Sequence, residues 1–185
     1  FVGRFDHIKG GDLVVEAFAL IAAAHPSAQF TFAGPDSGLP RAGGGMDMLS
    51  DRLARLPEPI RSRIRAVGKQ SREEVALLRA RHGVTLVASR YENFGGTLIE
   101  AMAAGSAVVA TRVGGQQEIA THEETVLMVP SEDTEAMANA CLRLMRDLSL
   151  ARRLGIAARS HVNSSYAPDV IARRMADFLA SVRRQ

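Results

Sequence analysis

Short apolar segments alternate with helical patterns along this chain. Short strands separated by helices predict βαβ units with right-handed crossovers, and strands that are apolar throughout predict a parallel sheet covered on both faces. We therefore predict an α/β fold with an open, parallel, six-stranded sheet flanked by helices. Strands are expected at 1–4, 28–34, 63–68, 84–89, 107–111 and 125–129, and helices at 10–24, 47–56, 71–81, 97–104, from about 115, and at 133–146, 148–162 and 168–183.

The loops that follow the strands are the expected places for function, because ligands of an open parallel sheet bind beyond the carboxyl ends of its strands. Loops of this kind, rich in glycine and in charged or polar residues, occur at 4–10, 68–71, 89–97 and 112–116. Glycine and proline are too dense at 36–45 for a regular element, so we expect a flexible loop there.

A pair of glycines, Gly95 and Gly96, stands where a strand gives way to a helix. The N-terminus of a helix presents unpaired N–H groups and a partial positive charge, and it binds phosphate. Glu92 precedes the pair and either faces a ligand or is simply solvated. Glu100 is expected on the first turn, where it either accepts hydrogen bonds from a ribose or closes a capping box with Thr97. The pattern fits a sugar joined to a nucleoside through a diphosphate.

The opening segment carries cations to the same edge of the sheet. Arg4 can donate a forked pair of hydrogen bonds to a diphosphate, and Lys9 can add a mobile point charge. Donors aimed at the charge that develops as a diphosphate leaves are typically worth about 10²–10³ in rate each. The alternative is that Arg4 and Lys9 are ordinary surface charges.

The composition excludes several other classes of protein. No apolar run among the 185 residues is long enough to span a membrane. The single cysteine, Cys141, cannot form an internal disulfide, which favours a reducing compartment. The chain opens inside an expected strand rather than with a signal peptide, so we interpret it as the tail portion of a longer protein.

The net charge of +3 is modest and does not indicate nucleic-acid binding. Arginine pairs at 152–153, 173–174 and 183–184 lie on expected helices among acidic and apolar neighbours, which is typical of solvated faces. The sequence has no Gly-x-Gly-x-x-Gly after a strand, which argues against a dehydrogenase. The histidines show no metal-ligand spacing.

Three stretches resemble the C-terminal, nucleotide-sugar-binding domain of GT-B retaining glycosyltransferases of family four, the glycosyl transferases group 1. They are "VGRFDHIKGGDLVVEAF", similar to the family's Gly-Arg…Lys-Gly loop, "VGKQSREEVALLRA", similar to the turn and helix that line the base, and "SRYENFGGTLIEAMAAGSAVVATRVGGQQEI", similar to its two-glutamate motif. The resemblance implies a Rossmann-like domain, the C-terminal half of a GT-B fold. Residues 1–185 would form this single donor-binding domain, with the N-terminal acceptor domain absent from the chain.

The resemblance also implies roles for individual residues. Arg4 and Lys9 would be catalytic through their hold on the diphosphate, and Glu92 would orient the donor sugar and stabilise positive charge near its anomeric carbon. Glu100 would bind the ribose hydroxyls, residues 68–70 would border the base, and residues 95–98 would contact phosphate or sugar. The implied substrate-binding residues are Gly3, Gly68, Lys69, Gln70, Asn93, Phe94, Gly95, Gly96, Thr97, Leu98 and Glu100.

The implied activity is transfer of a sugar, expected to be a hexose, from a nucleoside-diphosphate sugar with retention of configuration and without a metal or other cofactor. UDP and GDP are the expected carriers. The acceptor, a saccharide, a lipid-linked molecule or a small molecule in polysaccharide biosynthesis, would bind the missing domain. The expected location is the cytoplasm or the inner face of the membrane, and the chain alone would transfer little. The alternative is a non-catalytic nucleotide-sugar-binding module.

Several positions depart from the family pattern. Ala88 and Ala107 stand where the family often has proline, and Val67 replaces a frequent phenylalanine. Asn93 and Gly96 are less usual within the two-glutamate motif. These departures bear on the identity of the base and sugar more than on the class of enzyme.

Overall fold

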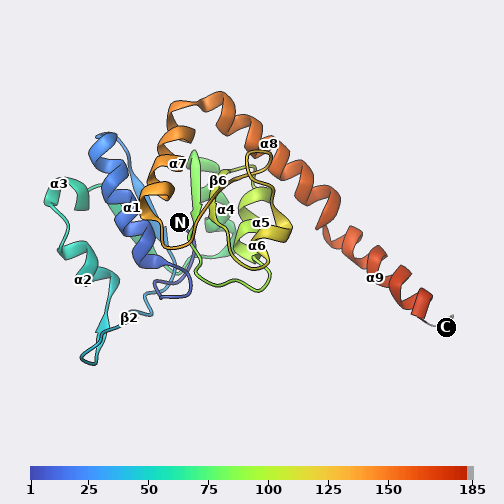
Figure 1. The fold of residues 1–185 in the computed structure, drawn as a ribbon, viewed down its shortest axis with the longest axis horizontal. Helices are drawn as coiled ribbons and strands as arrows, with labels where there is room; N and C mark the ends of the chain where they lie inside the picture. The colour runs from blue at the N-terminus through green and yellow to red at the C-terminus, as the bar shows by residue number, and fades with distance from the viewer. Residues whose placement is uncertain (183–185) are drawn as a thin grey trace.

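The computed structural model describes residues 1–182 and has parallel strands lying between helical layers (Figure 1). Strand β1 (Phe30–Ala33) pairs with β4 (Ile64–Gly68), while β5 (Val84–Val87), β6 (Ala107–Thr111) and β7 (Leu127–Val129) form a second parallel group in that order. The predicted α/β class is confirmed. Within the described residues, however, the parallel strands form two groups rather than one six-stranded sheet.

The apolar core lies on both faces of the strands. Successive side chains of a strand point to opposite faces, so Val109 of β6 packs under α1 and α7, whereas Val108 packs under α5 and the second half of α8. The helices are α1 (Gly11–Ala24), α2 (Leu49–Ala54), α3 (Glu58–Arg61), α4 (Arg72–Arg81), α5 (Gly96–Ala103), α6 (Gln116–Ile119), α7 (Thr134–Arg146), α8 (Leu148–Ser165) and α9 (Pro168–Val182).

The strand expected at residues 1–4 is the main departure from the predicted sheet. Residues 1–5 run parallel to β1 but form only isolated bridges, Val2 with Ala33 and Phe5 with Asp36. The opposite edge of this segment forms no ladder with β5 in the part of the chain that the structure describes. The two groups of strands are separate for this reason.

The Gly- and Pro-rich stretch at 36–45 contains part of a short hairpin, although we expected no regular element there. Strand β2 (Leu39–Pro40) pairs antiparallel with β3 (Met46–Asp47). The buried Asp47 carboxylate anchors the hairpin by accepting hydrogen bonds of 2.6–3.2 Å from three arginines, Arg41, Arg52 and Arg55. Charged groups therefore order this stretch despite its glycines.

Helix α9 extends away from the rest of the molecule beyond α8 (Figure 1) and has no buried residue. Four of its apolar side chains, Met175, Phe178, Leu179 and Val182, are more than half exposed. Arg173 pairs with Asp169 at 3.1 Å on its solvated face. The predicted arginine pair at 183–184 lies outside the described residues, as does the last residue of the helix expected at 168–183. In residues 1–182, none of the helices combines the length and apolar character needed to cross a bilayer.

Candidate functional site

The loop before α1 is fixed against the end of β5. Its Asp6 carboxylate accepts a hydrogen bond of 2.7 Å from the Lys9 backbone N–H. Gly10, the N-cap of α1, has a φ of 66°. A Cβ at Gly10 would lie 2.1 Å from the carbonyl oxygen of Ala88, so only glycine allows the two backbones to come this close. The contact holds the Lys9 side chain beside the loop that follows β5.

Lys9 and Glu92, both predicted as catalytic, contact each other directly. The Lys9 Nζ donates to Glu92 Oε2 at 2.5 Å, and the two side chains are 24% and 15% exposed. The Ser89 hydroxyl donates to the same oxygen at 3.4 Å. The structure therefore brings together two residues that lie 83 positions apart in the sequence.

Arg4 lies more openly than Lys9, with its side chain 52% exposed and its Nε donating to the Asp6 carboxylate at 2.5 Å. It borders a cavity of about 260 Å³ between the opening segment and the turn after β4. The predicted site residues that line this cavity are Gly3, Arg4, Lys9, Lys69 and Gln70. The loop that carries Arg4 and Lys9 and the expected base-binding turn thus line the same cavity.

The turn after β4 is held by its own hydrogen bonds. Gly68 has a φ of 67°, and its carbonyl accepts the Gly34 N–H at 2.8 Å. The Gln70 side-chain amide donates to the Val67 carbonyl at 2.7 Å. No atom lies within 4 Å of the position of a Cβ at Gly68, so this turn is open to solvent.

Helix α5 begins as the glycine pair predicts. Gly95 is its N-cap with a φ of 97°, and no side chain caps the helix. Gly96 is exposed, and no atom lies within 4 Å of the position of a Cβ there. A Cβ at Gly95 would lie 3.7 Å from Glu92 Cγ. The bare first turn of α5 is therefore next to the Glu92 carboxylate, which in turn contacts Lys9.

A second glycine pair fixes the backbone of the Glu92 loop. The Gly115 N–H donates to the Glu92 carbonyl at 3.1 Å. A Cβ at Gly114 would lie 2.0 Å from that carbonyl oxygen, and a Cβ at Gly115 would lie 2.4 Å from the Asn93 carbonyl oxygen. The turn after β6 can pack this tightly only because both residues lack side chains.

The placement of Glu100 corrects one prediction. Helix α5 begins at Gly96, so Glu100 lies beyond the first turn, and it forms no capping box with Thr97. Its Oε2 instead accepts a hydrogen bond of 3.1 Å from Arg79, whose side chain is 6% exposed, while that of Glu100 is 62% exposed. Burial lowers the pKa of Arg79, and the nearby Glu100 charge opposes this shift. The capping interpretation is wrong, and ribose binding stays a prediction.

The remaining predicted residues differ in what they can present to a ligand. Asn93 and Phe94 are exposed; the Tyr91 hydroxyl donates to Asn93 at 2.6 Å, and the Phe94 ring lies edge-on to Tyr166 with centroids 6.3 Å apart. Leu98 is fully buried in the core. Its side chain therefore cannot reach a ligand, which leaves only its backbone amide for the predicted role.

Arg90 is a residue of the site region that the sequence analysis missed. It donates to both oxygens of Asp12 at 2.7 and 2.8 Å and to the His7 carbonyl at 2.9 Å, and it also pairs with Glu132. These carboxylates raise the pKa of Arg90, so the guanidinium keeps its charge. Arg90 joins the start of α1 to the Glu92 loop. Asp12 lies 78 positions away, a separation that periodicity and motif spacing do not relate.

The polar groups at this edge of the strands are cations, carboxylates and helix amides. In the described residues, no group of three or more His, Cys, Asp or Glu side chains is placed to hold a metal ion. Gln116, which is fully buried beside Gly95, has a side-chain amide with no hydrogen-bond partner among residues 1–182. The arrangement suits an anionic ligand held by Arg4, Lys9 and the start of α5.

The structure is thus a parallel α/β domain with a glycine-rich edge that carries Arg4 and Lys9. The chain belongs to the family described as glycosyl transferases group 1, whose model matches residues 1–161. It is 31% identical over 170 residues to N-acetyl-alpha-D-glucosaminyl L-malate synthase of Bacillus anthracis, covering 92% of this chain and 42% of that protein. It is 28% identical over 184 residues to glycogen synthase of Mycobacterium tuberculosis, covering 100% of this chain and 42% of that protein. The chain thus spans less than half the length of these relatives.

Solved structures agree with the GT-B resemblance. Sucrose-phosphate synthase of Thermosynechococcus elongatus matches with a TM-score of 0.79 and 33% identity, over 99% of this chain and 44% of that chain. Anabaena HepE, solved in complex with UDP, has a TM-score of 0.80 at 20% identity over 97% of this chain and 47% of that chain. The C-terminal domain of the group 1 protein LpcC from Francisella tularensis has a TM-score of 0.74 at 21% identity, over 90% of this chain and 86% of that domain.

Proposed function

We propose that this chain is the donor-binding domain of a glycosyltransferase that moves a sugar, most simply a hexose, from a nucleoside-diphosphate sugar to an acceptor with retention of configuration. Membership of the family supports the class of reaction. One observation carries the assignment of the donor site: Lys9 contacts Glu92 beside the bare start of α5, and Lys9 and Arg4 border one cavity.

The proposed chemistry follows from where the charges lie. A diphosphate placed against the first amides of α5 meets the partial positive charge of the helix and the cations Arg4 and Lys9. These groups stabilise the negative charge that grows as the bond to the sugar breaks. Glu92 then lies on the sugar side, where its carboxylate stabilises positive charge at the anomeric carbon. The leaving phosphate accepts the proton of the attacking acceptor on the same face, which gives retention.

The cavity lined by Lys69 and Gln70 is the proposed place of the base. Its wall includes backbone from the opening segment and from the turn after β4. HepE has been solved with UDP and with UDP-glucose, which supports UDP as the nucleotide to test first. The curated relatives are more than twice as long as this chain, which supports an acceptor site on a separate domain. The chain by itself is then expected to bind the donor and to transfer little.

Isothermal titration of the chain with UDP and with uridine tests the proposal. Lys9→Ala and Arg4→Ala should each weaken UDP binding by about 10-fold or more, because each removes a charge-assisted contact to phosphate. Neither change should alter uridine binding by more than about 2-fold. Arg146→Ala, which removes an exposed charge at the end of α7, is the control and should leave both affinities unchanged.

A loss of uridine affinity equal to the loss of UDP affinity would contradict phosphate contact by Arg4 and Lys9. Turnover distinguishes the alternative of a non-catalytic binding module. In the full-length protein, Glu92→Gln should abolish sugar transfer and leave UDP affinity within a few-fold of the parent value. A parent protein that binds UDP-sugars but transfers no sugar to any acceptor tested would favour the binding module.

A further inference from the structure

All five N–H groups of the Arg90 guanidinium have partners within the molecule. The Asp12 carboxylate accepts two of them at 2.7 and 2.8 Å, and the His7 carbonyl accepts one at 2.9 Å. The Glu132 carboxylate accepts the other two, one of them at 3.1 Å. The Arg90 side chain is only 11% exposed. Because a guanidinium has five N–H donors, Arg90 has none left for a ligand and can affect the donor site only through its partners.

Arg90 is also hydrogen-bonded to the backbone that leads into Lys9. Its backbone N–H donates to the Ile8 carbonyl at 2.8 Å, and its side chain donates to the His7 carbonyl. Arg90 itself lies two positions before Glu92. It therefore connects the loop that carries Lys9 to the loop that carries Glu92, and the contact of 2.5 Å between these two side chains spans the same two loops.

Glu132, which follows β7 and pairs with Arg90, has a left-handed backbone with a φ of 67°. Glu123, which precedes β7, has a φ of 63° and pairs with Arg143. The two glutamates share a backbone conformation and a type of partner, but Glu123 lies at the amino end of the strand, away from the donor site. The left-handed conformation alone therefore does not mark a functional residue, and the contact with Arg90 is what distinguishes Glu132.

We propose that Arg90 is a positioning residue that keeps Lys9 in contact with Glu92. Asp12 and Glu132 fix the guanidinium in turn, so the segment after β7 affects the donor site without contacting the donor. The paired hydrogen bonds between Arg90 and Asp12 define an orientation as well as a distance. The proposal rests on the proposed function, because that function assigns the phosphate contact to Lys9.

Arg4 offers a comparison inside the same loop, because its position does not depend on Arg90. The next residue, Phe5, is fully buried, and its N–H donates to the Pro35 carbonyl at 2.9 Å. Arg4 is therefore anchored to the segment after β1, and within residues 1–182 none of the Arg90 hydrogen bonds involves residues 4 or 5. Loss of Arg90 should reduce the contribution of Lys9 to UDP binding and leave that of Arg4 unchanged.

The reactivity of Lys9 toward an acylating reagent tests the proposal without a ligand. Lys69 is the only other lysine in the sequence and is exposed, so it is the internal reference in each sample. Arg90→Met should raise the ratio of Lys9 to Lys69 modification at least about 3-fold, because the Lys9 amine then leaves its partly buried contact with Glu92 more often. Arg143→Met, which removes the matching ion pair with Glu123, is the control and should leave the ratio unchanged. Mass spectrometry of the two lysine peptides measures this ratio.

Glycine substitutions give a second matched pair of variants, which serves if Arg90→Met does not fold. Glu132→Gly and Glu123→Gly each remove a carboxylate from a left-handed position that glycine adopts readily. Glu132→Gly should raise the Lys9 to Lys69 ratio by about 2-fold or more, and Glu123→Gly should not. An unchanged ratio in folded Arg90→Met, or in Glu132→Gly where Arg90→Met does not fold, would overturn the proposal.

Isothermal titration with UDP distinguishes positioning from a purely structural role. Lys9→Ala, expected to weaken UDP binding by about 10-fold or more in the parent chain, should weaken it less than about 3-fold in the Arg90→Met background, because coupled residues have non-additive effects. Arg4→Ala should cost the same in both backgrounds. Equal losses from Lys9→Ala in the two backgrounds would show that Arg90 does not act through Lys9. If the parent chain does not bind UDP, the proposed function fails, and the reactivity ratio still decides whether Arg90 positions Lys9.

Discussion

At the scale of single residues, Glu100 has one observed contact and one proposed role, and substitutions can separate the two. Its carboxylate balances the charge of the buried Arg79, and its side chain is 62% exposed to solvent, where the proposed ribose contact would lie. A buried charge that loses its partner is strongly destabilising, whereas removing both partners is often neutral. The stability and the ligand affinity of variants at these two positions therefore report on different contacts.

Glu100→Ala is expected to lower the free energy of unfolding by about 1–3 kcal/mol, because it leaves the Arg79 guanidinium without its carboxylate. Arg79→Met in the same chain should restore most of that loss. If Glu100 binds the ribose, Glu100→Ala should weaken UDP binding about 10- to 100-fold, both in the parent chain and in the Arg79→Met variant. Arg79→Met alone should change UDP affinity only a few-fold. Denaturant unfolding and calorimetry give the two readouts. Unchanged UDP affinity in Glu100→Ala would leave Glu100 with the ion pair alone.

Several elements could be predicted from the sequence because local chemistry specifies them. The glycines at 95 and 114–115 mark turns whose φ angles or close backbone contacts exclude side chains, and both turns lie where predicted. Apolar runs gave β5 and β6 within a few residues. The ion pairs could not be predicted in this way. The Arg90–Asp12 and Arg79–Glu100 contacts join elements that are far apart in the sequence, and no periodicity relates them.

Two segments, residues 1–4 and the hairpin around residue 40, have a structure that differs from what their local sequence predicts. Residues 1–4 read as a strand, but a strand needs a neighbour on the correct edge, and local pattern does not specify that neighbour. Residues 36–45 read as a loop, but three arginines converge on Asp47 and order the hairpin. Residues 1–4 accordingly form only isolated bridges with β1, whereas tertiary contacts order the hairpin against its local sequence preference.

The start of α5 offers a matched pair of glycine substitutions. Gly95→Ala should lower the free energy of unfolding by about 1–2 kcal/mol, since its φ of 97° strains an L-residue and Ile119 lies 3.2 Å from the new Cβ. Gly96→Ala, one position further on and in open space, should be neutral or stabilise the chain by up to about 1 kcal/mol. Thermal unfolding measures both. Equal effects would mean that the left-handed turn is not maintained in solution.

At the scale of the whole molecule, the free energy of unfolding should depend on pH in a polypeptide that begins at Phe1. Its pKa is lowered from 8.0 in the unfolded chain to about 5 in the fold, so between these values the unfolded state binds more protons. The free energy of unfolding should therefore fall as the pH decreases from 8 to 5, by at most about 1.4 kcal/mol per pH unit. Denaturant titrations across this range measure the slope. The other ionisable groups that line the cavity beside Phe1 are His25, Arg79, His82, Cys141 and Arg152.

Acetylation of the Phe1 amine is the control for this prediction, because it removes the titrating group and keeps every histidine. The acetylated chain should show a shallower dependence on pH. If both chains lose stability in parallel as the pH falls, histidine protonation accounts for the slope and the amine is solvated.

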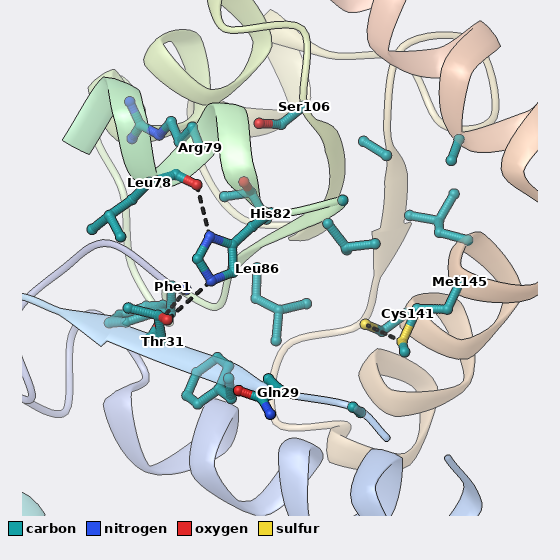
Figure 2. Close-up of a pocket in the computed structure, with 18 of the residues that line it drawn as sticks. Phe1, Gln29, Thr31, Leu78, Arg79, His82, Leu86, Ser106, Cys141 and Met145 are labelled. Carbon is teal, nitrogen blue, oxygen red and sulfur yellow. Dashed lines mark hydrogen bonds between the residues drawn. The ribbon is translucent and has the colours of Figure 1, made fainter. Parts of the chain in front are cut away.

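Cys141 lines a mainly apolar cavity of about 600 Å³ (Figure 2), where burial raises the pKa of its thiol to about 11. Near pH 8 only about one thiol in a thousand is then ionised, and alkylating reagents react with the thiolate. Because Cys141 is buried, its rate of modification by iodoacetamide measures how often the surrounding structure opens. Changes that loosen the packing around Cys141 should therefore raise its rate of modification by the reagent.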